Sequence, residues 1–551
     1  MLANELHETE TLTPSFEAPG PGTWQQDPAH WPRPATPWTA EVFNSGFPRG
    51  FAESTRRYGV LLSHLEPAVI EGYVYYRAVP AADPGPRFEA AREALESRLW
   101  RADQRLWDEE FKPDSIRRNR RLQSVDVTSL SDADLARHLE LCLENHEEMV
   151  YRHHKFNMAA LLPVGLFVAR AAAWTGLSNG ELLGLLRGSS PVSNGTAADE
   201  LRAVGEALRE ERLGPQSFAP DLPAGCVLEL LAGRPGRVGE TVRAYLDACG
   251  FHVASGYDVT DLSARELPDM LVNSFWKAAA APEREVDRAE AAAGLRRVRE
   301  AVPAEHRAEF DDLLAEARLV NHVRDERGLY NDLWAAGLSR RAIQEAGRRL
   351  TLRGRLDSDE QIFEASSREM IALLSGESRP TAVELAARAR RRSSIPLAAV
   401  PPVLGDPPSA PPSLDGLPEP ARTAAEAFGT ALDEILGSST EHHDERVVRG
   451  KAVSPGIHEG RARVISGPAD FNRLEKGDVL VASSTSAAFN VVLPLLGAIV
   501  TDRGALLSHA AIVAREYGIP GVVGTREATS LVPDGAWVRV DGTHGTVEVL
   551  R

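Results

Sequence analysis

The chain has 551 residues, 43% of them hydrophobic and 26% charged, and its formal net charge is -17 at pH 7. This length exceeds what one hydrophobic core usually serves, so roughly two to four domains are expected. The acidic balance argues against a general nucleic-acid binder, because such a protein needs a basic face to displace counterions from phosphates.

The cysteines and the apolar runs narrow the class of protein further. Cys142, Cys226 and Cys249 lie far apart with no CxxC pair, which predicts neither a zinc site nor a disulfide framework. The N-terminus lacks the basic and apolar regions of a signal peptide, and the longest apolar run, residues 158–169, is too short to span a bilayer. We therefore expect a soluble cytoplasmic protein with no bound metal and no membrane or nucleic-acid partner.

The first three quarters of the chain are predicted to be mainly helical. Residues 1–20 are polar and are expected to form a flexible N-terminus, and the proline- and tryptophan-rich segment 21–48 is expected to be extended rather than helical. From about residue 81 to 376, apolar residues recur at spacings of three and four, which is the pattern of amphipathic helices. Residues 21–399 are thus predicted to be one large helical domain that includes the extended segment.

A change of composition separates this region from the end of the chain. Residues 400–449 begin with a proline-rich stretch, continue into a short helix and a charged segment, and are predicted to be a semi-rigid linker in which His442 and His443 are solvated. From residue 450 to 551, short β-rich runs alternate with glycine turns. A compact C-terminal α/β domain is therefore predicted.

Within this α/β domain, one histidine stands where a helix is predicted to begin. Ser508 is a good N-cap and Gly518 a good C′ residue, so the predicted helix places His509 in its first turn. The first turn carries unpaired backbone N–H groups and the positive end of the helix dipole, which stabilise an anion such as phosphate. A buried histidine that only caps its own helix is the alternative.

The segments KAVSPGIHEGRARVI, GDVLVAS, TDRGALLSHAAIVAREYGIPGVVGT and VRVDGTHGTVEV resemble the phosphohistidine swivelling domain of phosphoenolpyruvate-utilising enzymes. The resemblance implies that His509 carries a phosphoryl group and that Ser508 and Gly504 lie against it. The chain departs from the family at Ala505, where a second glycine is common, and at Leu507, where the dikinases have threonine. Alanine at position 505 narrows the space in which the backbone can approach phosphate. Leucine at position 507 is closer to the rifampicin-type enzymes than to the dikinases.

The helical region resembles the substrate-binding domain of rifampicin phosphotransferase-like proteins in the segments GYDVTDLSARELPDML, VRDERGLYNDLWAAGLSRRAIQEAGRRL and DEQIFEASSREMIALL. No stretch resembles the ATP-grasp domain that phosphorylates the histidine in these enzymes, and none resembles the barrel that binds phosphoenolpyruvate. The resemblance implies that this chain binds no cofactor itself and that a separate ATP-grasp protein, holding Mg-ATP, loads His509.

Several charged residues of the helical region are candidates for substrate binding. Arg324 and Arg327, with His322, fall where the family places charged residues that face the transferring phosphate. Arginines three positions apart share a helix face and can hold phosphate oxygens, although a solvated, ion-paired helix is the alternative. His252 follows a predicted helix end and is a further pocket candidate.

Two other patterns are set aside. His153 and His154 are adjacent on a predicted helix, so they are expected to face different ways and not to share a metal. Residues 233–241, GRPGRVGET, resemble a phosphate-binding loop only superficially, because Glu240 stands where the lysine belongs. A turn between helices is predicted there.

Two functions from different classes remain. The first is a phosphotransferase component that carries phosphate on His509 to a small hydroxylated or enolic substrate bound in the helical domain. The linker favours this function, because one histidine must visit two sites and a semi-rigid tether raises its effective concentration at both. The second is a non-catalytic binding or regulatory protein that retains the fold, which the intact SHAA motif around His509 disfavours.

Overall fold

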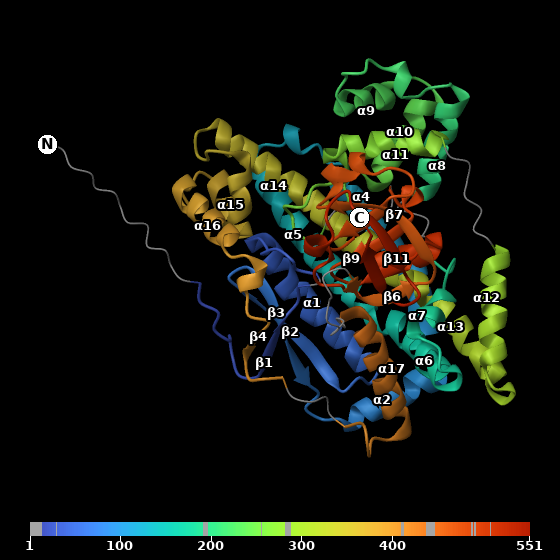
Figure 1. Ribbon diagram of the computed structural model, residues 1–551. Helices are drawn as coiled ribbons and strands as arrows, with labels where there is room; N and C mark the ends of the chain where they lie inside the picture. The colour runs from blue at the N-terminus through green and yellow to red at the C-terminus, as the bar shows by residue number, and fades with distance from the viewer. Residues whose placement is uncertain are drawn as a thin grey trace.

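The computed structural model describes residues 14–28, 30–190, 197–254, 256–280, 288–408, 413–436, 447–485, 489, 492–506 and 508–550. The predictions for His442, His443 and Leu507, and for most of the N-terminal segment, lie outside these ranges. Helices dominate up to residue 436 and strands dominate from residue 447 onward (Figure 1). The predicted fold class, a large helical part followed by a C-terminal α/β domain, is confirmed.

The helical part is built mainly from α-helices with short loops between them. Its helices are α1 (Pro37–Arg57), α2 (Gly85–Ser97), α3 (Trp100–Leu106), α4 (Lys112–Gln123), α5 (Asp132–Lys155), α6 (Asn157–Thr175), α7 (Asn179–Gly184), α8 (Ala198–Glu210), α9 (Ala224–Gly233), α10 (Arg237–Cys249), α11 (Pro268–Ala280), α12 (Arg288–Ala301), α13 (Arg307–Arg327), α14 (Trp334–Leu352), α15 (Ser367–Leu374), α16 (Ala382–Ser394) and α17 (Glu419–Leu436). The segment between α9 and α10 is a turn, as predicted for the false phosphate-binding loop.

The apolar helix α6 is the centre of this part. It packs against α13 and α17, and a Cβ atom at Gly165 would lie only 2.0 Å from the backbone oxygen of Ala427 in α17. Burying each leucine-sized side chain contributes ~1.5–3 kcal/mol, so this helix supplies much of the core. The stretch Asp132–Thr175 is long and apolar enough to cross a membrane, but 78% of its apolar window is buried inside the protein, as in a core helix.

Beside these helices lies an antiparallel sheet, which has four strands within the described residues. This sheet was not predicted from the sequence. Its strand order is β2-β3-β1-β4. The strands are β1 (Thr23–Gln26), β2 (Leu62–Ile70), β3 (Tyr73–Pro80) and β4 (Val403–Gly405). The strand β4 comes from the proline-rich segment, so this part of the predicted linker is anchored to the N-terminal region rather than free, and α17 is likewise packed on α6.

The proline- and tryptophan-rich segment is only partly extended. Residues 23–26 form β1, but α1 begins at Pro37, and the prediction of an extended segment up to residue 48 is wrong. Thr36 caps this helix through its side chain, and Pro37 occupies the first turn, where its missing N–H costs nothing. Proline therefore starts the helix here instead of preventing it.

The C-terminal domain contains a mixed sheet of eight strands within the described residues, in the order β5-β12-β11-β7-β8-β9-β10-β6. Strands β7, β8, β9 and β10 run parallel to one another, and the flanking strands β11 and β6 pair with them antiparallel. Along β8, Val479 and Val481 enter one apolar core, whereas Leu480 and Ala482 enter the other, which also contains α18. The elements are β5 (Val447–Arg449), β6 (Lys451–Ser454), β7 (Ile457–Ile465), β8 (Val479–Ala482), β9 (Ala498–Thr501), α18 (His509–Tyr517), β10 (Gly521–Val523), α19 (Ala528–Leu531), β11 (Trp537–Asp541) and β12 (Thr546–Val549).

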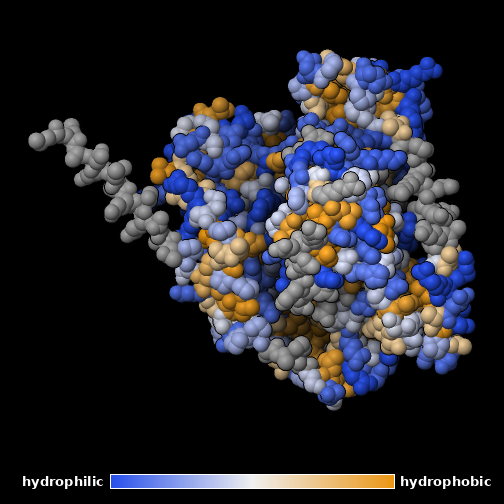
Figure 2. Space-filling model, viewed as in Figure 1, coloured by the Kyte–Doolittle hydropathy of each residue, from blue (hydrophilic) through white to orange (hydrophobic). Residues whose placement is uncertain are grey.

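The C-terminal domain packs against the helical part. The helix α7 contacts β6, and a Cβ atom at Gly180 would lie 2.8 Å from the backbone oxygen of Ala452. The Glu516 carboxylate of α18 accepts hydrogen bonds of 3.0 Å from the backbone N–H of Gly188. On the face seen in Figure 2 the surface is mostly hydrophilic, with hydrophobic groups in separate clusters. The packing places the start of α18 beside the helices.

Candidate functional site

The helix that carries His509 begins and ends where the sequence predicts. Ser508 is its N-cap, and the Ser508 hydroxyl accepts a hydrogen bond from the backbone N–H of Ala511. Gly518 ends the helix in the left-handed conformation. His509 is therefore the first helical residue, at the positive end of the helix dipole, as expected for a residue that holds an anion.

The conformation of Gly504 and the hydrogen bonds of Asp502 hold the loop before this helix in place. Gly504 has φ +115°, and a Cβ atom there would lie 2.7 Å from the hydroxyl oxygen of Ser508, so this position requires glycine. Asp502 is buried and accepts hydrogen bonds from the backbone N–H and the hydroxyl of Thr529. Ala505, the departure from the family pattern, is fully buried. The loop thus brings Gly504 and Ser508 together next to His509.

A hydroxyl group from the loop that follows β8 orients the imidazole of His509. Thr485 Oγ1 lies 2.9 Å from His509 Nδ1, in a hydrogen bond that fixes the plane of the ring. Sequence analysis missed Thr485. No local pattern marks it: Thr485 follows β8 and His509 follows β9, and only the parallel pairing of these strands brings their carboxyl ends together at one edge of the sheet.

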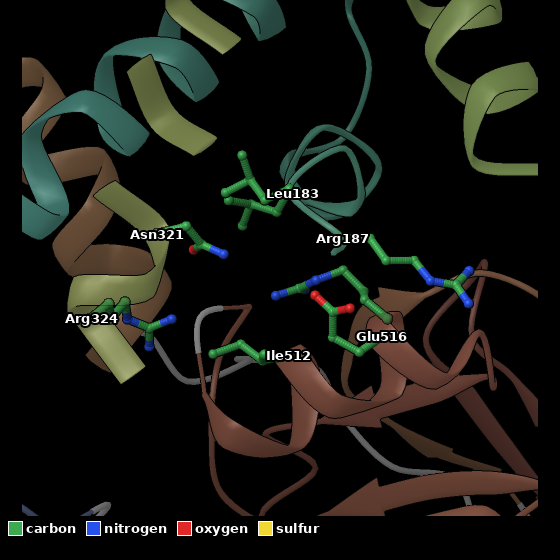
Figure 3. A pocket seen from close by; sticks show the side chains of 8 residues that line it. Leu183, Arg187, Asn321, Arg324, Ile512 and Glu516 are labelled. Atoms are coloured by element: carbon green, nitrogen blue, oxygen red, sulfur yellow. The ribbon is translucent and has the colours of Figure 1, made fainter. Parts of the chain in front are cut away.

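The helical part contributes an arginine to this site. Arg324 projects from α13, and its Nη1 is buried with no hydrogen-bond partner among the described residues. The same arginine lines a pocket whose walls come from α7 and the turn after it, α13 and α18 (Figure 3). The pocket residues are Leu183, Leu186, Arg187, Asn321, Arg324, Ile512, Arg515 and Glu516. The two parts of the chain therefore meet where a cation faces the histidine helix.

Burial and this cation keep His509 neutral. Burial, reinforced by the positive charge of Arg324, lowers the pKa of His509 to about 4. A neutral imidazole is nucleophilic, whereas an imidazolium is not. The depressed pKa means that the nucleophilic form persists from alkaline pH down to about pH 4.

This shift gives a spectroscopic prediction. At pH 5.5 an ordinary histidine, with a pKa of about 6.5, is roughly 90% protonated. His509 is expected to remain neutral at that pH, because its pKa lies near 4. NMR of ¹⁵N-histidine-labelled protein, with the resonance assigned by its loss in His509→Gln, measures this pKa directly. A titration midpoint near 6.5 would contradict the burial of the ring.

Arg327 lies near Arg324 but is already engaged by protein groups. Its guanidinium donates hydrogen bonds to the backbone oxygen of His153, at 3.2 Å, and to the side-chain oxygen of Asn157. Burial, reinforced by the charge of Arg324, lowers the pKa of Arg327 to about 9. The structure thus brings both arginines to one region, with Arg327 supporting the α5–α6 junction.

His322 and His252 are placed elsewhere. His322 Nε2 lies 3.2 Å from the Asp108 carboxylate, in a group that also contains Glu326. Lys112 Nζ forms ion pairs with both Asp108 and Glu326, so the ammonium group already neutralises this cluster. His252 is buried and packs against the ring of Trp334 at 5.0 Å. Neither histidine lines the pocket beside Arg324, and their assignment to the substrate site stays a prediction.

His153 and His154 do not face different ways as predicted. Their rings stack with centroids 4.5 Å apart, because side chains 100° apart around a helix still converge when both lean toward the same space. His153 Nδ1 lies against the Asp332 carboxyl group, and the His154 ring packs on Phe47. Burial lowers the pKa of both histidines well below the ordinary value. They belong to a buried polar network beside Arg327.

Comparison with known proteins agrees with this geometry. Residues 474–545 match the family described as PEP-utilising enzyme, mobile domain. The chain is 31% identical over 246 residues to an uncharacterized phosphotransferase, YvkC, of Bacillus subtilis, an alignment that covers 44% of this chain and 27% of that protein. It is 44% identical over 110 residues to a rifampicin phosphotransferase of Bacillus cereus, covering 20% of this chain and 13% of that protein.

A third relative belongs to the same family. The chain is 42% identical over 120 residues to a phosphoenolpyruvate synthase of Pyrococcus furiosus, covering 21% of this chain and 15% of that protein. The chain thus spans about a quarter or less of the length of these three relatives. The resemblance to phosphoenolpyruvate-utilising enzymes, and among them to rifampicin phosphotransferase-like proteins, is confirmed.

Proposed function

Because the C-terminal domain is a mobile domain of the phosphoenolpyruvate-utilising family, we propose that this chain is a phosphotransferase component whose His509 carries a phosphoryl group to a small hydroxylated or enolic acceptor in the helical part. The observation that carries the proposal is the apposition of His509 and Arg324, whose charge lowers the pKa of the histidine. These residues lie 185 positions apart, in different parts of the chain.

We propose a role for each group. With Nδ1 bonded to Thr485, Nε2 is the nitrogen that we assign to the phosphoryl group. Phosphoryl transfer needs little covalent chemistry from the protein, but it needs an in-line acceptor and positive charge around the three equatorial oxygens. The N–H groups at the start of α18 supply part of that charge, and the buried guanidinium of Arg324 supplies the rest.

The source of the phosphoryl group is a second part of the proposal. No stretch of the sequence resembles an ATP-grasp domain, so we propose that a separate ATP-grasp protein with bound Mg-ATP loads His509. The C-terminal domain would then move between that protein and the helical part. The contact of Glu516 with the backbone of Gly188 would fix the delivering position, in which His509 faces Arg324.

Loading of the histidine tests the proposal. The purified chain is incubated with Mg²⁺ and labelled ATP, with and without an ATP-grasp phosphotransferase domain. We expect acid-labile, base-stable phosphate only when the ATP-grasp protein is present, since the label sits on a histidine nitrogen. Loading by ATP in the chain alone would contradict the need for a partner, and an acid-stable label would contradict phosphohistidine chemistry.

A further inference from the structure

A second histidine, His30, is held by a carboxylate in the turn that follows β1. His30 Nδ1 lies 2.8 Å from Asp27 Oδ2, and the backbone N–H of His30 donates to Asp27 Oδ1 at 3.1 Å. The carboxylate is 8% exposed, whereas the imidazole is 40% exposed. Asp27 therefore fixes one ring nitrogen from the protein side and leaves the ring accessible to solvent.

This turn lies on the side of the helical part that receives His509. Arg503, in the loop that leads into α18, donates a hydrogen bond of 2.7 Å to the backbone oxygen of Pro28. The charge of Arg324 lowers the pKa of both His30 and His509, so the guanidinium lies near both imidazoles. The Tyr257 ring, 36% exposed, lies 6.4 Å from the His30 ring. A hydroxyl compound beside Arg324 would be flanked by His509 and His30.

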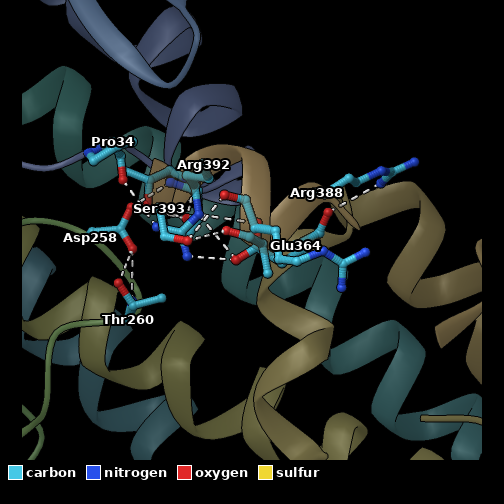
Figure 4. Close-up of polar contacts among 11 residues, drawn as sticks. Pro34, Asp258, Thr260, Glu364, Arg388, Arg392 and Ser393 are labelled. Carbon is cyan, nitrogen blue, oxygen red and sulfur yellow. Dashed lines mark hydrogen bonds and ion pairs between the residues drawn. The ribbon is translucent and has the colours of Figure 1, made fainter. Parts of the chain in front are cut away.

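The segment that carries His30 is firmly supported. Trp31 Nε1 donates to the Tyr76 hydroxyl at 3.2 Å, and the backbone N–H of Thr36 donates to the Asp258 carboxylate at 2.7 Å. Arg392, held by Glu364, donates to the backbone oxygen of Pro34 at 3.2 Å (Figure 4). A side chain on such a support keeps its position while an acceptor binds, which is what a catalytic group requires.

We propose that His30 is the general base of the transfer step, an inference that rests on the proposed function. His30 Nε2 takes the proton of the acceptor hydroxyl as the acceptor oxygen attacks phosphorus. The bond between phosphorus and His509 breaks, and its electron pair returns to the imidazole of His509. Phosphorylated His509 keeps a proton on Nδ1, which it donates to Thr485 Oγ1, so breaking the N–P bond leaves a neutral imidazole. The products are the phosphate ester, neutral His509 and a His30 imidazolium that Asp27 stabilises, so protons and charges balance.

The surroundings of His30 set the direction of a pH effect. Asp27 is the main influence and raises the pKa of His30, while burial and the charge of Arg324 oppose it. Tyr257, from the loop before α11, and the neutral His153 and His154 of α5 also face this space. A base acts in its unprotonated form, so transfer should increase with pH through the pKa of His30.

The experiment uses the full chain loaded on His509 with labelled ATP and an ATP-grasp phosphotransferase domain and then freed of both, and water and glycerol as hydroxyl probes. The rate of phosphate loss is measured from pH 5 to 9 in wild type and in His30→Gln. Ordinary phosphohistidine is most stable at alkaline pH, so a wild-type rate that increases toward alkaline pH is the signature of a protein base. We expect His30→Gln to lose this increase, with a rate lower on the order of 10²-fold at pH 8.

The chain offers a matched control. Asp541 and His544 form the same Asp-x-x-His turn, with Nδ1 and Oδ2 2.9 Å apart, on a β-hairpin where His544 is 75% exposed. His544→Gln should keep the wild-type profile, and Asp27→Asn should move the increase to lower pH because it removes the group that raises the pKa of His30.

Two results would overturn the inference: a wild-type rate that does not increase with pH, or an unchanged profile in His30→Gln. Loading in each variant shows that it is folded. A label that persists in His509→Gln would instead refute the proposed function, and the inference with it.

Discussion

Replacing His509 with glutamine is expected to abolish all acid-labile, base-stable phosphate on this chain. Glutamine occupies a similar volume and can still bond to Thr485, but its amide nitrogen is not a nucleophile. The helix should survive the substitution, because its cap residues Ser508 and Gly518 are unchanged. The measurement is the stoichiometry of label after incubation with labelled ATP and an ATP-grasp phosphotransferase domain.

A second substitution separates the nucleophile from its support. Thr485→Val removes the hydroxyl 2.9 Å from His509 Nδ1 and keeps the size of the side chain. We expect slower loading but a similar final stoichiometry, because the imidazole remains and loses only its orientation. Label that persists in His509→Gln at the wild-type level would place the phosphate on another residue and remove His509 from the chemistry.

The local signals around His509 could be predicted from the sequence, because they depend on nearest neighbours along the chain. An N-cap serine, a first-turn histidine and a C-terminal glycine lie within eleven residues, and their geometry follows from the helix alone. Thr485 could not be assigned in this way. Its position depends on the pairing of β8 with β9, which brings together two strand ends that no local pattern connects.

Two predictions in the helical part depend on features that the local sequence does not decide. Proline in the segment before residue 48 favours an extended chain in general, but Pro37 occupies the one helical position that tolerates it. The family resemblance grouped His322 with Arg324, but residues two apart on a helix point in different directions. His322 therefore meets Asp108, while Arg324 meets the C-terminal domain.

The proposed role of His30 could not be predicted from the sequence either. An aspartate and a histidine three positions apart in a proline-rich segment are common in turns and carry no specific motif. Their significance arises from tertiary structure, because Arg503 of the C-terminal domain contacts this turn and Arg324 lies near His30. The family resemblance is strongest in the swivelling domain, whereas only tertiary contacts indicate which residues of the helical part lie near the proposed acceptor.

Arg324→Gln is expected to slow transfer from phosphorylated His509 on the order of 10²-fold while leaving the loading of His509 in place. The guanidinium Nη1 is buried without a hydrogen-bond partner among the described residues, an arrangement that costs free energy unless a ligand completes it. A phosphoryl oxygen is the group that fits, because it is anionic and arrives on the facing helix. Single-turnover transfer to glycerol, or to an acceptor found by screening metabolites with the phosphorylated protein, measures the effect.

Two comparisons show whether the loss comes from the charge near His509. Arg307 lies at the start of the same helix and donates to the backbone oxygen of Val302, so Arg307→Gln removes a cation from α13 without touching the pocket walls, and its transfer rate should stay near wild type. In Arg324→Gln the pKa of His509 should increase from about 4 toward 6.5, because a positive charge that opposes protonation is gone. Arg324→Lys keeps the charge but not the planar fork, so its transfer rate should lie between those of the wild type and Arg324→Gln.

If Arg324→Gln transfers at the wild-type rate while the His509 pKa shifts as expected, the arginine tunes the histidine but does not hold the transferred phosphate. The acceptor site must then draw its cation from another element.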